Sequence, residues 1–262
     1  MCYNGSMFDG IDIAGGLTPE TKLFRYVRLS QFLSFVEEKQ LVLTRIKQWE
    51  DTWEVPHRTI PFRDENGKLD RPIYTIYDDM LGQCWSLHEE SDALWRIYSP
   101  NREGLVIRTT VQAFEQLTDI RFGVLAPVVY YRDLMEGIRD IEGKKDYFHI
   151  FASAFLKREA FAHEKEVRLV TLNDERHVTS YQLGAEHIPI RVDPASFVQG
   201  VIIDPRASDW FVTMIRSYCQ RAGFSCKPVQ SRLYSSDIYE STGIVTQITP
   251  VKPNDKVDGT HE

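Results

Sequence analysis

Features that would assign this sequence of 262 residues to several function classes are scarce or absent. Its four cysteines, Cys2, Cys84, Cys219 and Cys226, are spaced neither as a metal knuckle nor as a dense disulfide framework. No apolar run reaches the roughly 18 residues of a membrane span, and the first residues lack a basic segment followed by an apolar one. We therefore expect reduced thiols and a cytoplasmic protein.

An excess of basic residues is also missing. Asp and Glu number 38 against 31 Lys and Arg, which gives a formal net charge of -7. Proteins that coat nucleic acids normally present a basic face that displaces counterions from phosphate, so this class is disfavoured. A local basic cleft remains open, and one early region concentrates basic side chains: Arg28, Arg45, Lys47, Arg58 and Arg63.

Well-known catalytic motifs are absent as well. The sequence has no GxSxG elbow, no GxxxxGK[ST] phosphate loop, no GxGxxG fingerprint and no HExxH helix. Any chemistry must therefore rest on a less stereotyped set of residues.

The composition is that of a globular protein, with 42% hydrophobic and 12% aromatic residues. Residues 1–20 are rich in glycine and polar groups, and residues 248–262 are charged and interrupted by proline. We expect these to be flexible arms on either side of a single catalytic-type domain at 21–247.

Hydrophobic periodicity predicts alternating short elements within this domain. Helices are expected at 30–40, 91–99, 110–117, 146–161 and 208–223, with Ser30, Ser91 and Ser208 as caps. Strands are expected at 22–29, 41–46, 82–87, 104–110, 124–131, 166–172 and 198–205. The order lacks strict βαβ alternation, which favours an α+β fold with mixed, mostly antiparallel sheets and flanking helices.

The segment EKEVRLV, residues 164–170, combines an apolar strand pattern with several ionisable groups. A period of two places Glu164, Glu166 and Arg168 on one face, and Val167 and Leu169 on the other. One interpretation is a packed strand that presents a chemical face to a cleft, with His163 and Lys165 in the adjoining loop. The other, favoured by alternation alone, is a half-solvated strand with a surface ion pair.

Other candidates are equally ambiguous by themselves. Arg25 could be an ordinary exposed arginine, and Trp95 and Tyr98 could be core aromatics rather than a binding platform. In the segment WEDTWE, residues 49–54, the carboxylates of Glu50, Asp51 and Glu54 either begin a solvated helix or line a site.

The order of these segments resembles a large bacterial family known as a domain of unknown function. The likeness covers roughly residues 23–207 and includes the segments at 23–54, 84–107, 128–131, 157–170 and 198–207.

The sequence also resembles, more remotely, the ADP-ribosyltransferases that act on DNA as bacterial toxins. Their first strand, helix and returning strand are resembled by FRYVRLSQFLSFVEEKQLVLT. Their serine strand and aromatic-bearing helix are resembled by CWSLHEESDALWRIYS, and their catalytic glutamate strand is resembled by EKEVRLV. Arg25 stands where many members carry histidine, and Glu164 and Glu166 are both candidates for the glutamate.

This resemblance implies an ADP-ribosyltransferase-like fold and NAD as the substrate. It implies a macromolecular acceptor, nucleic acid or protein, and a toxin or anti-phage defence effector with an antitoxin or immunity partner. The implied catalytic residues are Glu166, Arg25 and Tyr98. Implied NAD-binding residues are Arg25, Tyr26, Ser86, Trp95, Tyr98 and Arg168, and the implied substrate loop contains Asp51, Glu54 and Glu164.

These roles are chemically consistent. A carboxylate stabilises the positive charge that develops on ribose when the bond to nicotinamide breaks. A guanidinium can form two parallel hydrogen bonds to a diphosphate, and an aromatic face attracts the cationic nicotinamide. Ser86 would support the glutamate by a hydrogen bond.

Two alternatives remain. One is a non-catalytic module that binds a nucleotide or a partner through the same cleft. The other is a metal-dependent hydrolase or nuclease whose oxygen-rich ligands would be Asp51, Glu54, His57, Glu164 and Glu166.

Overall fold

The computed structural model describes residues 10–51, 53–54, 61–63, 65–70, 76–144 and 150–235. Its strands are β1 (Gly10–Ile13), β2 (Lys22–Val27), β3 (Gln40–Arg45), β4 (Phe62–Arg63), β5 (Leu69–Asp70), β6 (Met80–Ser86), β7 (Leu105–Thr110), β8 (Phe122–Pro127), β9 (Val129–Tyr131), β10 (Leu156–Arg158), β11 (Glu166–Leu172), β12 (His187–Arg191), β13 (Gly200–Ile203) and β14 (Val229–Gln230). Its α-helices are α1 (Leu29–Glu38), α2 (Asp92–Tyr98), α3 (Leu134–Glu142), α4 (Pro194–Phe197) and α5 (Asp209–Arg221). The 3-10 helices are η1 (Ile46–Gln48), η3 (Ile76–Asp79), η4 (Val111–Gln116), η5 (Ala152–Phe155) and η6 (Glu159–Glu164).

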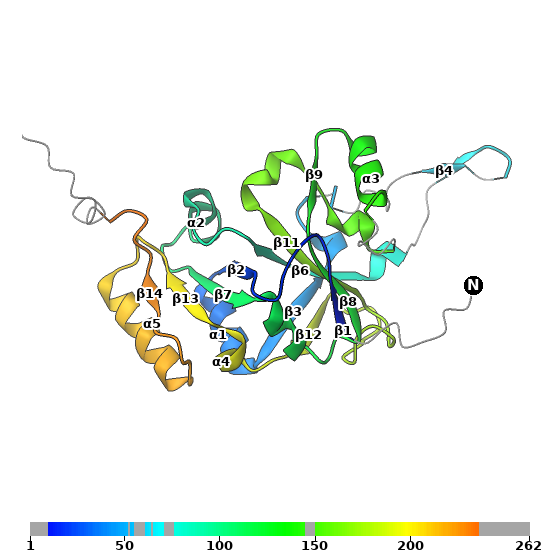
Figure 1. The fold of residues 1–262 in the computed structure, drawn as a ribbon. Coiled ribbons are helices and arrows are strands. Elements are labelled where there is room, and N and C mark those ends of the chain that lie inside the picture. Colours follow the sequence, from blue (N-terminus) through cyan, green and yellow to red (C-terminus); the bar gives the residue numbers. More distant parts are fainter. Residues whose placement is uncertain are drawn as a thin grey trace, which may run out of the picture.

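Within the described ranges, ten strands form one sheet (Figure 1). Its main path runs β1-β8-β11-β6-β2-β7-β13-β14, and β3 and β12 join it through β6. Pairing is parallel at the two ends, β1 with β8 and β13 with β14, and antiparallel everywhere else in the sheet. The predicted α+β class with a mostly antiparallel sheet is therefore confirmed.

The sheet divides at β6. One end of β6 pairs with β3, where Thr44 lies opposite Gly82, and the other end pairs with β2, where Phe24 lies opposite Ser86. Residues 83–85 lie between these two contacts and have no strand partner on that side among the described residues. The Gln83 side chain partly closes the gap by donating a hydrogen bond of 3.1 Å to the backbone oxygen of Val42.

Helices cover both faces of the sheet because successive strand residues point to opposite sides. Helices α1, α4 and α5 pack on one face, in a core that includes Phe32, Phe211 and Leu169. On the other face α2 packs over β2, β7 and β13, while α3 and η5 pack over β8 and β11. Figure 1 shows α2 and α3 well separated along the sheet. Glu166 and Arg168 share the strand parity of Val170, so they lie on this second face, at the start of β11.

The helices predicted at 30–40, 91–99 and 208–223 form, as α1, α2 and α5. Phe32, Phe35 and Val36 are the buried side of α1, and Ser91 caps α2 by accepting a hydrogen bond from the Leu94 backbone nitrogen. Gly223, with φ of 83°, follows the end of α5. Ser30 is not the cap of α1: the helix begins one residue earlier, and the Arg28 backbone nitrogen donates to the Gln31 side chain instead.

Two helix predictions are wrong. Residues 110–117 form the 3-10 helix η4 rather than an α-helix. In the helix predicted at 146–161, the described residues form η5, strand β10 and the start of η6. The apolar spacing there fits a helix, but the segment finds its partners by pairing β10 with β9, so tertiary contacts override local pattern. The strand predicted at 124–131 is two strands, β8 and β9, separated at Val128.

Part of the expected N-terminal arm belongs to the sheet, since residues 10–13 form β1 and pair with β8. Residues 1–9 and the C-terminal segment at 248–262 lie outside the described residues. No helix in the described part of the chain has the length and apolar character to cross a membrane.

Candidate active site

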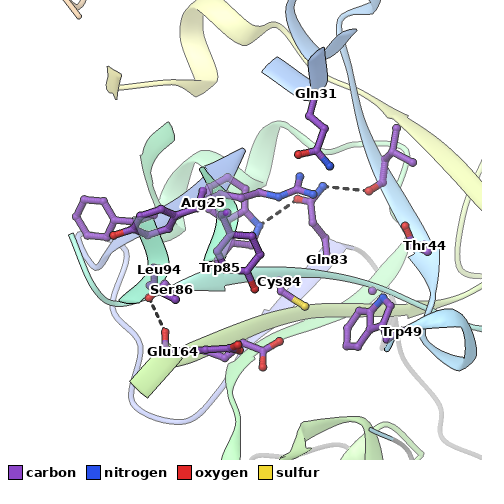
Figure 2. Close-up of a pocket in the computed structure, with 16 residues that line it drawn as sticks. Arg25, Gln31, Thr44, Trp49, Gln83, Cys84, Trp85, Ser86, Leu94 and Glu164 are labelled. Atoms are coloured by element: carbon purple, nitrogen blue, oxygen red, sulfur yellow. Dashed lines mark hydrogen bonds between the residues drawn. The ribbon is translucent and has the colours of Figure 1, made fainter. Parts of the chain in front are cut away.

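A cavity of about 260 Å³ opens where the sheet divides at β6 (Figure 2). Its walls combine side chains from both faces of the sheet, because the gap between β2 and β3 interrupts the layer. Arg25, Gln31 and Gln83 lie toward α1, while Ser86 and Glu166 lie on the opposite face. The remaining walls are Phe24, Tyr26, Val42, Thr44, Trp49, Gly82, Cys84, Trp85, Leu94, Tyr98 and Glu164.

The carboxylate of Glu166 lies at the centre of a buried charge cluster. It accepts a hydrogen bond of 2.6 Å from Lys157 Nζ, and bonds of 2.9 and 3.1 Å from Arg168 Nε and Nη2. The Glu166 side chain is 3% exposed and the Arg168 side chain 0%. Buried charges require such partners, because an isolated ion in the protein interior carries a large desolvation cost.

The WEDTWE segment completes this cluster. Glu54 pairs with Arg168 and lies 3.6 Å from Lys157, and the Trp49 ring stacks over the Arg168 guanidinium at 4.9 Å. A β-carbon at Gly82 would come within 2.8 Å of the Trp49 ring, so glycine leaves room for this packing. Asp51 receives two hydrogen bonds, of 3.0 and 3.1 Å, from Arg158. The alternative in which WEDTWE begins a solvated helix is therefore wrong for Glu54.

These contacts set the ionisation of the cluster. Burial would raise the pKa of Glu166, but Arg168 and Lys157 outweigh it and lower that pKa to about 2. Burial would lower the pKa of Lys157, but Glu166 and Glu54 more than offset this, and the lysine pKa is raised. Glu166 is consequently a carboxylate, and Lys157 a cation, at neutral pH. For Glu54 burial prevails, and its pKa is raised.

The two candidate glutamates have different positions. Glu166 begins β11, and every residue of that strand is buried, which excludes the half-solvated strand. Glu164 instead ends η6, and Lys165 follows with φ of 41°, so Glu164 does not share the face of Glu166 by strand alternation. The Glu164 carboxylate accepts a hydrogen bond of 2.6 Å from Lys157 Nζ. The Glu164 backbone oxygen accepts another, also of 2.6 Å, from Ser86 Oγ. Ser86 thus supports the glutamate segment, though through Glu164 rather than Glu166.

Arg25 differs from Arg158 and Arg168 in having no counterion in the part of the chain that the structure describes. Among the described residues, its guanidinium makes no hydrogen bond or ion pair, and in Figure 2 it extends from β2 toward β3 and Gln31. Burial lowers its pKa, with only Cys84 and Tyr98 opposing this effect. Strand parity places Arg25 and Glu166 on opposite faces of the sheet, yet both line the same cavity because the sheet is divided there.

The aromatic side chains have separate roles. Tyr98 is 40% exposed and lines the cavity, with burial as the main cause of its raised pKa. Tyr26 also lines the cavity and packs 5.1 Å from Trp95, edge to face. Trp95 itself is 0% exposed and lies beneath Tyr26. The predicted direct contacts of Trp95 and Arg168 with NAD are therefore not supported, because neither side chain lines a described cavity.

A second cavity of about 540 Å³ adjoins the first. Both are lined by Trp49, Cys84, Tyr98, Glu164 and Glu166. The second is otherwise walled by Glu50, Asp51, Trp53, Glu54, Lys157, Arg158 and Phe161. Asp51, Glu54 and Glu164, the predicted substrate loop, are therefore brought together here.

Lys157, Gln83 and Cys84 are site residues that the sequence did not indicate. The role of Lys157 could not be predicted because residues 146–161 have the apolar spacing of a helix. The only indication in the sequence is a lysine directly after the apolar run AFL. The Cys84 thiol lies between the two cavities, and its pKa is raised well above the ordinary value, mainly by burial and by Glu166. It is therefore a protonated thiol rather than a nucleophilic thiolate.

Three of the residues named for a metal site already have cationic partners. The carboxylates of Glu54, Glu164 and Glu166 are already bound by Lys157 or Arg168. The part of the chain that the structure describes contains no group of three His, Cys, Asp or Glu side chains placed to hold a metal ion. His57 lies outside the described residues.

No family model and no curated protein matches the sequence. A search of solved structures finds similarity to Thermus sp. 2.9 DarT in complex with NAD+, with 9% identity, a TM-score of 0.39, and coverage of 82% of this chain and 98% of that one. The same protein in complex with ADP-ribosylated ssDNA gives 11% identity, a TM-score of 0.38, and coverage of 82% and 96%. Likeness at this level does not fix an activity.

Proposed function

We propose that this protein is an NAD-dependent ADP-ribosyltransferase that uses Glu166 as its catalytic carboxylate. The observation that carries the proposal is the first cavity, which is lined by an ionised glutamate and, across the divided sheet, by an arginine that has no counterion among the described residues. A dinucleotide has the matching chemistry, with a cationic nicotinamide riboside at one end of an anionic diphosphate.

Glu166 is suited to stabilise a developing cation. Cleavage of the bond between nicotinamide and ribose places positive charge on the ribose, and a fixed carboxylate near that atom lowers the barrier. Lys157 and Arg168 keep the carboxylate ionised and hold its orientation. The fully buried strand that carries Glu166 limits its movement.

Arg25 and Tyr98 are assigned to binding. The Arg25 guanidinium lines the first cavity and makes no hydrogen bond with the described residues, so it can fork onto the diphosphate or a ribose of the adenosine half. The exposed ring of Tyr98 lines both cavities and can face the nicotinamide cation, an attraction of about 0.5 to 2 kcal/mol. Tyr26 supports the same wall.

The test is cleavage of labelled NAD by the purified protein, alone and with a cell lysate. Wild type should release nicotinamide and transfer label, and Glu166→Gln should reduce the rate by roughly a hundred- to a thousandfold, as for loss of one transition-state electrostatic partner. Glu159→Gln is a matched control, because Glu159 pairs with Arg132 at the surface. Equal rates for wild type and Glu166→Gln would remove the basis of the proposal.

A non-catalytic nucleotide-binding module is the second candidate. It is favoured by one observation: both oxygens of Glu166 already accept hydrogen bonds from Lys157 and Arg168. In that case NAD binds, Arg25→Ala weakens binding, and NAD is recovered intact after incubation.

The toxin or defence role is proposed on the family resemblance alone. Expression in bacteria should arrest growth, and Glu166→Gln should relieve the arrest. Growth arrest that persists in Glu166→Gln would separate toxicity from the proposed chemistry.

A further inference from the structure

We propose that the second cavity binds a guanidinium group, so that the acceptor is an arginine side chain of a protein. This inference rests on the proposed function, because it names the acceptor for the same reaction centre. The second cavity shares Tyr98, Glu164 and Glu166 with the first, so a group bound there lies next to the carboxylate at which NAD would be cleaved.

The charge of the second cavity favours a cation. Among the residues that the structure describes, its walls carry two cations, Lys157 and Arg158, and five acidic side chains, those of Glu50, Asp51, Glu54, Glu164 and Glu166. Arg168 behind the wall compensates one further charge. The excess of carboxylates attracts a cationic group and opposes a phosphate.

Two side chains of this wall are free to receive such a group. Among the described residues, Glu50 has no hydrogen bond or ion pair, and its side chain is exposed. The Trp53 ring is 46% exposed and makes no described ring contact. A planar guanidinium can fork onto a carboxylate and stack on an indole at the same time, which an ammonium cannot.

The protein already holds one of its own guanidinium groups in this manner. Arg158 forks onto Asp51, with distances of 3.0 and 3.1 Å, and lies over the Phe161 ring at 5.3 Å. Both Asp51 and Phe161 belong to the same wall. The cavity surface therefore has the chemistry that binds arginine.

A nucleic-acid acceptor has less support in the described residues. Arg45, one of the five basic residues concentrated in the early region, is buried and bonds to Asp79, to the Asp78 backbone and to the Ala185 backbone. Lys47 lies 3.9 Å from Asp78. Arg58 is outside the described residues.

The transfer balances as follows. One guanidinium nitrogen forms a bond to the ribose carbon that carried nicotinamide, and the electron pair of the broken bond leaves on neutral nicotinamide. The attacking nitrogen loses one proton, for which Glu164 is placed as acceptor: it lines both cavities and its side chain is more exposed than that of Glu166, at 15% against 3%.

The experiment supplies agmatine, a small guanidinium compound, as acceptor with labelled NAD. Cadaverine, a diamine, and a single-stranded oligonucleotide are compared in parallel. We expect labelled agmatine and little label on the other two. Glu50→Gln and Trp53→Ala should each raise the KM for agmatine about tenfold, the scale of one lost ion-pair or cation–π contact. Trp210→Ala, at an exposed tryptophan on α5, is the matched control and should leave this KM unchanged.

Label on the oligonucleotide and not on agmatine would overturn the inference while leaving the transferase intact. If the protein does not cleave NAD, calorimetric titration of agmatine still tests whether the second cavity binds a guanidinium group, independently of the proposed transferase activity. Saturable binding that Glu50→Gln and Trp53→Ala weaken supports the cavity assignment, and absence of saturable binding overturns it.

Discussion

The ammonium of Lys157 lies 2.6 Å from a carboxylate oxygen of Glu166 and 2.6 Å from one of Glu164. The buried Lys157 ammonium thus contacts both glutamates that the sequence left as candidates, Glu166 at the start of β11 and Glu164 at the end of η6. Because Arg168 binds only Glu166 of these two, the cluster distinguishes them electrostatically. Glu166 is the carboxylate whose ionised form is held by two cations.

Removal of Lys157 should change the pH dependence of NAD cleavage. Lys157 helps to lower the pKa of Glu166 to about 2, so Lys157→Met should raise that pKa and move the acid limb of the rate profile to higher pH. Lys157→Arg should keep most of the wild-type limb because the positive charge remains. The profile of kcat against pH measures this, with Lys227→Met at an exposed lysine as control. An unchanged acid limb in Lys157→Met would contradict the role given to this lysine.

Arg25→Ala should weaken NAD binding without weakening the fold. Loss of a charged hydrogen-bond donor to the diphosphate should raise the KM for NAD roughly ten- to a hundredfold. The free energy of unfolding should not fall, because the buried guanidinium has no described counterion to lose. Steady-state kinetics measure the KM for NAD, and a denaturant titration measures the free energy of unfolding. A large loss of stability with unchanged KM would mean that Arg25 is a structural residue.

Arg168→Met should have the opposite effect on stability. Its guanidinium pairs with Glu166 and Glu54 and donates to the Ala154 backbone oxygen at 2.5 Å. Removing one partner from a buried ion cluster leaves charge uncompensated, and the cost is about 3 to 5 kcal/mol. Arg25→Met is the matched control for the same change of side chain. Equal unfolding free energies for the two variants would show that the cluster does not stabilise the fold.

The stability of the fold should fall in acid partly through Asp119. Hydrogen bonds from the Arg191 side chain are the main cause that lowers the pKa of Asp119 to about 2. The native state thus binds this proton less readily than the unfolded chain, whose Asp has a pKa of about 3.9. The stabilisation is complete above that value and is lost as the pH falls toward 2. Asp119→Asn should lower the urea midpoint at neutral pH and flatten its decline between about pH 5 and 2. A parallel decline in wild type and variant would exclude this contribution.

The elements predictable from the sequence are those whose own side chains bury one face. In α1 the spacing of Phe32, Phe35 and Val36 predicts the buried side correctly, and in β11 the run from Val167 to Leu172 predicts a core strand. The segment at 146–161 shows the limit of this reasoning. Its aromatic spacing indicates a helix, whereas β10 exists because β9 offers a pairing edge that local sequence does not reveal.

The candidate site shows the same limit. The sequence identifies Arg25, Ser86, Tyr98 and Glu166 as polar or aromatic residues on predicted elements, and all four line the first cavity. It cannot show that Trp95 lies beneath Tyr26, since this contact joins segments far apart in the chain. It also cannot show that Lys157 reaches Glu166, because this contact depends on residues 156–158 forming β10 rather than part of a helix.

The sequence by itself determined the α+β class, the helices α1, α2 and α5 and the strand bearing Glu166, because periodicity and capping act over a few neighbouring residues. Only the tertiary structure decided that the sheet divides at β6, that Arg25 and Glu166 meet in one cavity from opposite faces, and that Lys157 and Arg168 hold Glu166 ionised. The reason is physical: strand register and the pairing of buried charges depend on which distant segments share the low-dielectric interior, and this is fixed by packing of the whole chain.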